Sequence, residues 1–131
     1  MNLVRKMLWS AIGAAALAAP AVAQAPSALS SLQLGMWQLR STGGSGAGRS
    51  ICIRTAEQLL QIQHQTRNCQ RRTLGSTSNS VTVRYECGGG VWGQTQLNVE
   101  TPRLARIDTQ GISGGAPFHN YYEARRTGAC G

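Results

Sequence analysis

Ser80-Val81-Thr82-Val83-Arg84-Tyr85-Glu86-Cys87 is the stretch of the sequence that decides the fold. Its apolar side chains at 81, 83 and 85 alternate with polar ones at 82, 84 and 86, and this period of two is typical of a half-buried strand. The alternation continues through most of the range 69–126. The sequence therefore predicts a mainly β domain, in which a strongly curved antiparallel sheet forms a meander or an incomplete barrel.

The flanking segments complete this predicted sheet. The same kind of pattern predicts further strands over 32–40, 49–54, 91–100, 104–111 and 118–126. The Gly- and Ser-rich range 41–48 is predicted to be a flexible loop. Thr55 followed by Gln58 is a capping-box pattern, which predicts one short helix from Ala56 to about Ile62.

Four cysteines, Cys52, Cys69, Cys87 and Cys130, are predicted to form two disulfides. If the hairpin turn lies at 77–79, residues whose numbers sum to 156 face each other, and Cys87 opposes Cys69. Opposed residues of this kind have Cα atoms about 4.5 Å apart, which a disulfide tolerates. Cys52 is then left to pair with Cys130. Zinc is not expected, because the gaps are long and no Cys-x-x-Cys pair is present.

Register arguments also predict cross-strand neighbours. In the hairpin, Arg72 falls opposite Arg84, a like-charge pair that needs solvent or an acid nearby. Further along, Ile107 is expected opposite both Leu97 and Tyr122, which would form a core row. On the reverse face, Arg106 is expected opposite Glu123 as an exposed ion pair.

Residues 1–23 have the pattern of a secretory signal peptide, with Arg5 and Lys6 before an apolar run and a cleavage site after Ala23. Residues 24–31 are predicted to be a loosely ordered lead, and 32–131 a single disulfide-tied domain. We expect a periplasmic monomer with no membrane span after cleavage. Eleven arginines and five acidic residues would remain, a balance of +6 that favours anionic partners. Nucleic acid is not expected for an exported chain, and the scattered arginines also suit a solvated surface.

No catalytic constellation is evident in the sequence. Only His64 and His119 could serve a Ser/His/acid triad, and Ser113 near His119 lacks the Gly-x-Ser-x-Gly context. The acidic residues of the predicted strands fall on polar faces, where most can be matched to arginines. The chain is therefore predicted not to be an enzyme and to need no cofactor, with a small hydrolase as a remaining alternative.

Several short motifs occur in a fixed order along the chain: Gly35-Met36-Trp37, Cys52 to Gln58, Cys69, Tyr85 to Gly90, and Arg126 to Cys130. This order resembles the exported proteobacterial family called domain of unknown function 3617, over residues 35 to 130. The resemblance implies an exported, disulfide-tied fold and no assigned activity. The proline that usually follows the helix-capping Thr of that family is Ala56 here.

A second resemblance is to the periplasmic inhibitors of C-type lysozyme. It rests on Tyr85-x-Cys87, Cys130 and the Ser- and Gly-rich stretch from Gln110 to Phe118. The resemblance implies a loop that inserts Ser113 between the catalytic carboxylates of an enzyme. The tyrosine expected after the Ser-Gly is missing, and a Lys-free loop cannot supply the family's lysine.

We therefore interpret the chain as a binding module for a small or anionic envelope ligand, with a protein-binding inhibitor of a cell-wall enzyme as the alternative. Aromatic residues near arginines are favoured at binding surfaces. The candidate ligand-binding residues are Trp92, Arg106, His119, Tyr121 and Arg125.

Overall fold

A computed structural model describes residues 12–20 and 27–131. The predicted cleavage site after Ala23 lies outside the described residues. Residues 12–20 have no regular secondary structure and are exposed. Within the described ranges, no helix has the length and apolar character needed to cross a membrane.

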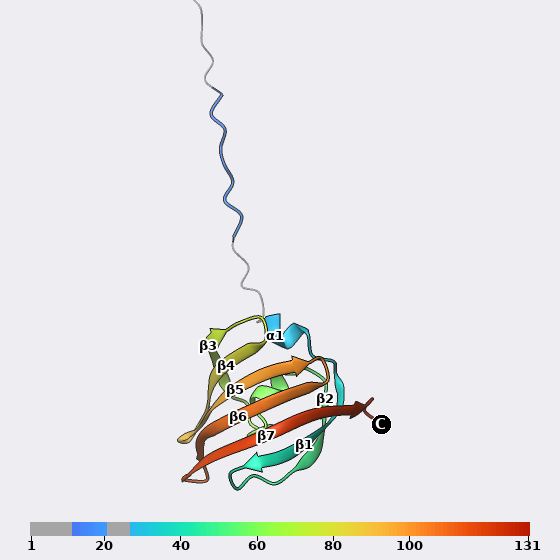
Figure 1. Cartoon of the computed structure of the whole chain (residues 1–131). Helices are drawn as coiled ribbons and strands as arrows, with labels where there is room; N and C mark the ends of the chain where they lie inside the picture. The colour runs from blue at the N-terminus through green and yellow to red at the C-terminus, as the bar shows by residue number, and fades with distance from the viewer. Residues whose placement is uncertain (1–11, 21–26) are drawn as a thin grey trace, which may run out of the picture.

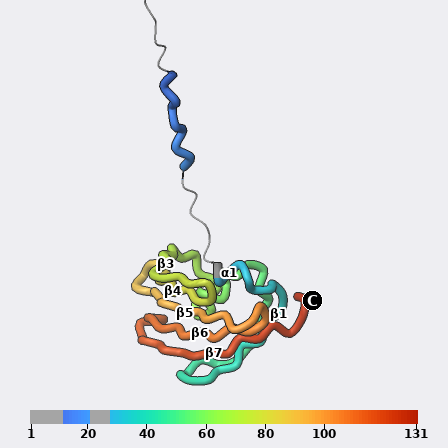
Figure 2. Tube along the Cα trace, turned by 45° about the horizontal axis from the view of Figure 1, so that its top comes forward, coloured from blue at the N-terminus to red at the C-terminus, as the bar shows by residue number. Residues whose placement is uncertain are grey.

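The domain is a seven-stranded antiparallel sheet (Figure 1). The strands are β1 (Gly35–Gly43), β2 (Arg49–Ile53), β3 (Gln70–Ser76), β4 (Ser80–Gly88), β5 (Val91–Thr101), β6 (Leu104–Ser113) and β7 (Ala116–Gly128). Their order is β2-β1-β7-β6-β5-β4-β3, so five consecutive strands form the predicted meander and β1 returns beside β7. The end strands β2 and β3 do not pair with each other, so the sheet is strongly curved but open (Figure 2).

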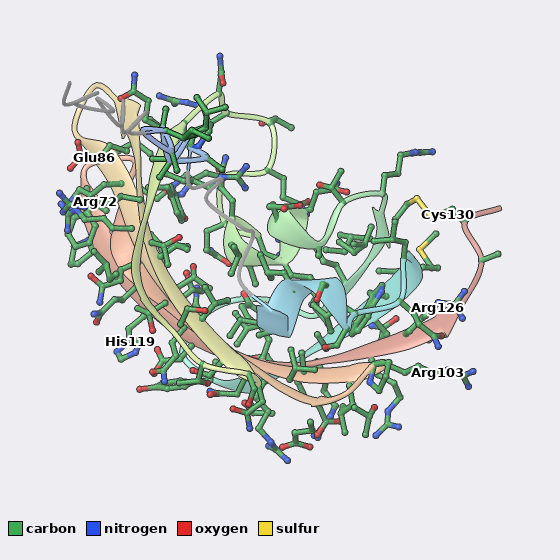
Figure 3. The ribbon with its side chains drawn as sticks, turned by 90° about the horizontal axis from the view of Figure 1, so that it is seen from above. Arg72, Glu86, Arg103, His119, Arg126 and Cys130 are labelled. Carbon is green, nitrogen blue, oxygen red and sulfur yellow. A yellow bond between two sulfur atoms is a disulfide. The ribbon has the colours of Figure 1, made fainter. Side chains whose placement is uncertain are left out.

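The inner, concave face of the sheet holds the core. Seen from above, the sheet forms a U around two short helical segments, while the labelled Arg72, Glu86 and His119 lie outside it (Figure 3). The predicted core row is confirmed, because Leu97 pairs with Ile107 and Ile107 pairs with Tyr122. All three are at most 2% exposed, and Val81 continues the row on β4.

The helical segments differ from the prediction. Residues Ala56–Leu60 form a 3-10 helix, η1, whose Leu59 and Leu60 pack into the core. The predicted loose lead is wrong for its last residues: Ser27–Ser30 form a short helix, α1, in which Ala28 and Leu29 are buried. Apolar burial explains the order here, because Leu29 and the following Leu32 join the core cluster.

Both predicted disulfides are confirmed. Cys69–Cys87, called here the hairpin disulfide, joins residues whose Cα atoms are 4.1 Å apart. Cys52–Cys130, the terminal disulfide, ties the end of the chain to β2 across 5.6 Å. The predicted hairpin register holds from Gln70↔Glu86 to Thr73↔Val83, after which a bulge shifts it by one residue.

The predicted loop over 41–48 is shorter than expected. Strand β1 continues to Gly43, since Ser41 pairs with Tyr122. The remaining turn folds over the inner face, where the Oδ1 atom of buried Asn120 accepts hydrogen bonds from the backbone N–H groups of Ser45 (3.0 Å) and Gly46 (2.9 Å). A Cβ atom at Gly46 would overlap the Tyr122 hydroxyl, so the close approach requires glycine.

Candidate functional site

The five candidate residues from the sequence all project from the outer, convex face of the sheet, at alternate positions of β5, β6 and β7. Trp92 and His119 line one shallow depression, and Arg106 and Tyr121 line another. Arg125 lines neither. The structure thus brings these residues together in pairs and not into one pocket.

Most arginines of the outer face have a carboxylate partner. Arg106 binds Glu100 and lies 4.0 Å from Glu123, its predicted cross-strand partner. The Glu100 hydrogen bond raises the pKa of Arg106 above its usual value. Arg125 also lies 3.8 Å from Glu123. Exposed pairs of this kind contribute little to stability, but each of these arginines has a carboxylate within 4.0 Å.

Arg84 of β4 is also paired, whereas Arg72 of β3 forms no ion pair within the described residues. Arg72 and Arg84 are opposite each other, as predicted, and the required acid is Glu86, 3.3 Å from Arg84. The guanidinium of Arg84 also lies 4.1 Å from the ring centroid of Trp92. The face therefore contains stacked and paired cations.

A Ser113–His119 catalytic pair does not form. His119 pairs with Gln110 on the ladder, whereas Ser113 pairs with Ala116, three residue pairs away. This separation is about 10 Å along the strands, and the two side chains alternate to opposite faces. The Nε2 atom of His119 lies 2.7 Å from Asp108 instead.

The Ser- and Gly-rich stretch is a tight hairpin turn and not an extended loop. Gly114 and Gly115 form the two-residue connection and have φ angles of +60° and +77°, which suit glycine in such turns. Ser113 and Ala116 are already paired on either side. Insertion of a long Ser113 loop into an enzyme cleft therefore finds no support in this geometry.

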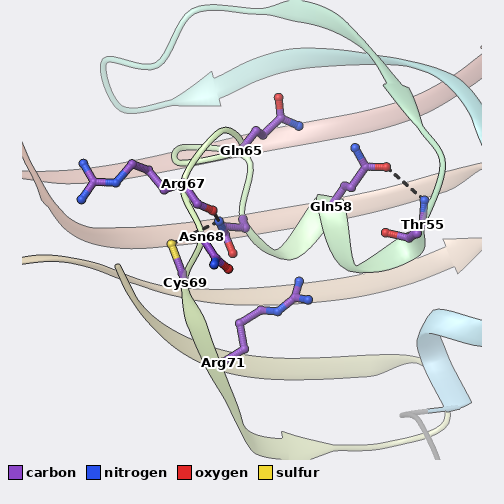
Figure 4. Close-up of a pocket in the computed structure, with 8 residues that line it drawn as sticks. Thr55, Gln58, Gln65, Arg67, Asn68, Cys69 and Arg71 are labelled. Carbon is purple, nitrogen blue, oxygen red and sulfur yellow. Dashed lines mark hydrogen bonds between the residues drawn. The ribbon is translucent and has the colours of Figure 1, made fainter. Parts of the chain in front are cut away.

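A different site lies on the opposite side of the molecule, where η1 and the chain after it approach β3 (Figure 4). We call it the basic groove. Its lining residues are Thr55, Gln58, Gln61, Gln65, Arg67, Asn68, Cys69 and Arg71. The groove is polar, contains no acidic lining residue and lies beside the hairpin disulfide.

Two glutamines give the groove its shape. The Oε1 atom of Gln58 accepts hydrogen bonds from the backbone N–H groups of Arg54 (2.6 Å) and Thr55 (3.0 Å). These bonds cap η1 and form the glutamine side of the predicted capping box. The Nε2 atom of Gln61 donates to the carbonyls of His64 (2.7 Å) and Arg67 (2.9 Å). Gln61 is buried, so these bonds hold the 61–68 loop in one shape.

The two arginines of the groove are anchored but not neutralised. Arg71 donates from Nη1 to the carbonyl of Glu57 (3.2 Å), and in Figure 4 its side chain rises from β3 toward η1. Arg67 points away from it and donates from Nη2 to the carbonyls of Cys87 (3.3 Å) and Gly88 (3.5 Å). Within residues 12–20 and 27–131, neither guanidinium forms an ion pair. Both keep donors and a full charge available to a ligand.

A buried histidine connects the 61–68 loop to the sheet. His64 is 7% exposed, and its Nδ1 atom lies 2.8 Å from the hydroxyl of Tyr85. Burial, followed by the nearby charge of Arg67, lowers the pKa of His64, while burial raises the pKa of Tyr85 to about 12. Both side chains are therefore neutral near pH 7, and they connect the loop to the sheet.

Sequence reasoning missed the basic groove, although a signal was present. No acidic residue stands between Glu57 and Glu86, whereas four arginines do: Arg67, Arg71, Arg72 and Arg84. The sequence-based prediction instead chose aromatic residues of the strands and the arginines near them. Only the fold shows that this acid-free segment turns back on η1.

No protein-family model, curated protein or solved structure matches the chain. Within the described ranges, no group of three or more metal-binding side chains is present either. The two resemblances noted in the sequence remain predictions.

Proposed function

We propose that the protein is an exported, non-catalytic binding module that holds an anionic ligand of the bacterial envelope in the basic groove. One observation carries this proposal: Arg67 and Arg71 are positioned by backbone carbonyls, with no carboxylate to neutralise them. Arginine in such a setting favours phosphate and carboxylate groups, which it binds through two parallel N–H···O bonds.

The groove also suits a ligand that carries hydroxyl groups. The side chains of Gln65 and Asn68 line it, are exposed, and make no hydrogen bond within the described part of the chain. Amide side chains supply both donors and acceptors. A sugar with a phosphate or carboxylate substituent would use Arg71 for the charge and these amides for the hydroxyls.

Export is supported by two features. Residues 1–23 have the composition of a signal peptide, and the structure contains two disulfides, which persist in oxidising compartments such as the periplasm. In that compartment the accessible anions include phosphorylated and carboxylated saccharides of the envelope.

The proposal is tested by calorimetric titration with an N-acetylglucosamine phosphate, with N-acetylglucosamine as the uncharged comparison. We expect the phosphate to bind and Arg71→Gln to weaken binding about tenfold or more, as expected for a charged hydrogen bond. Arg40→Gln is the matched control, because it removes the same charge from an arginine 3.2 Å from Glu123 on the outer face. Equal losses of affinity in both variants would show that only the net charge of the protein matters and would refute binding in the basic groove.

A further inference from the structure

The outer face carries a row of three shallow depressions, which we call the trough. The first and second depressions share Gln110, and the second and third share Asp108. The floor of the trough follows alternate residues of β6 from Ile112 to Arg106. The six residue steps from Ile112 to Arg106 span about 20 Å, which is the length of a short oligosaccharide and not of one sugar ring.

Amide side chains line the trough at regular intervals. Gln94, Gln96, Asn98 and Gln110 project from β5 and β6, and Gln94 and Gln110 are direct cross-strand partners. None of these four amides makes a side-chain hydrogen bond within the ranges that the structure describes. They therefore present solvated donors and acceptors at the spacing of the strands.

Aromatic rings border the trough at Trp92, opposite Ile112, and at Tyr121, opposite Asp108. Trp92 borders the first depression together with residues of β6 and β7, while Arg84 of β4 stacks on it from the other direction. Tyr121 borders the third depression, is 40% exposed, and stacks on His119 with ring centroids 4.6 Å apart. Rings supported in this way offer rigid apolar surfaces beside polar groups.

The charged side chains of the trough already have partners of opposite charge or hydrogen-bond partners. Asp108 lies 2.7 Å from His119, and Arg106 is engaged by Glu100 and Glu123. An anionic ligand would have to displace these partners, whereas an uncharged polyhydroxylated chain would not. We propose that the trough binds an extended, uncharged glycan of β-linked hexopyranoses, independently of the anionic ligand in the basic groove. A floor that follows a single extended strand favours such an extended chain over a coiled α-linked one.

Chitohexaose is the probe, and its binding is followed by amide and indole N–H shifts in nuclear magnetic resonance spectra of the isotope-labelled protein. We expect shifts at Trp92, Gln110 and Tyr121, weaker binding of chitobiose and of maltohexaose, and an affinity that is unchanged between about 0.05 M and about 0.5 M salt, because no charge is neutralised. If the basic groove bound no anionic ligand, these chemical shifts would still be expected, so the two sites are tested separately.

Variants give a second readout. Gln110→Ala should weaken chitohexaose binding about threefold to tenfold, as expected for one or two hydrogen bonds, and Trp92→Leu should weaken it further. Gln38→Ala is the control, because it removes an exposed amide from β1 outside the trough. Absence of shifts at all three residues up to about 1 mM saccharide would overturn the proposal and leave the face to a protein partner. Strong salt dependence would overturn the uncharged ligand class.

Discussion

Gly93→Ala tests how the sheet supports the basic groove. A Cβ atom at this position would overlap the ring of Tyr85, with Cε1 only 2.6 Å away. Tyr85 is fully buried and cannot move aside without breaking its hydrogen bond to His64. Overpacking costs about 1–3 kcal/mol, and loss of the hydrogen bond costs about 0.5–1.5 kcal/mol. We therefore expect the free energy of unfolding to fall by about 2–4 kcal/mol.

The assay is urea unfolding followed by circular dichroism, with the disulfides intact. Gly75→Ala is the matched control, because it lies in β3 with open space at its Cβ position. This control should change the free energy of unfolding by less than about 0.5 kcal/mol, as is usual for surface substitutions. If Gly93→Ala were no more harmful than Gly75→Ala, the ring of Tyr85 would not be packed against Gly93, and the support described for the loop would be wrong.

Three further predictions concern stability. Replacing both cysteines of the terminal disulfide by serine should lower the free energy of unfolding in urea titrations by about 4.5 kcal/mol, and the same replacement in the hairpin disulfide should lower it by about 3.2 kcal/mol. The difference arises because loop-closure entropy grows with the separation of the two cysteines, which is 78 residues in the first case and 18 in the second. A larger loss for the hairpin disulfide would contradict this reasoning. The pKa of His64 lies below its ordinary value of 6.5, so the unfolded chain takes up the proton first and stability should fall as the pH drops below about 6.5, by at most about 1.4 kcal/mol per pH unit. His64→Gln should flatten that part of the pH profile of stability; an unchanged slope in this variant would assign the effect elsewhere. Asn120→Ala should cost about 1–3 kcal/mol and speed hydrogen exchange at the two amides that it accepts from, and normal protection there would show that the 44–48 turn is held by other contacts.

Much of the fold could be predicted from local pattern. Alternation in Ser80–Cys87 gave the strand and its buried face, and the hairpin register led to both disulfides. These inferences worked because the side-chain period of a strand is two, so one fixed turn determines which residues face each other. The order in the helical segments could not be predicted in the same way. Ala28 and Leu29 are ordered by burial against distant strands, which their polar and proline-containing surroundings in the sequence do not indicate.

The candidate site was harder to predict for a physical reason. Arg106 looked like a binding residue by itself, but its neighbour in the fold, Glu100, already pairs with it. Arg67 and Arg71 looked like ordinary surface cations. Their carbonyl partners at Cys87 and Glu57 are brought close only by the tertiary structure.

The measurement that tests the central claim most directly is a chemical-shift map of the isotope-labelled protein with an N-acetylglucosamine phosphate. The claim predicts that Gln65, Asn68 and Arg71 shift first and saturate together, that the outer face is unaffected, and that rising salt weakens the binding. Shifts centred on the outer face, or none at the basic groove while the ligand binds, would contradict it.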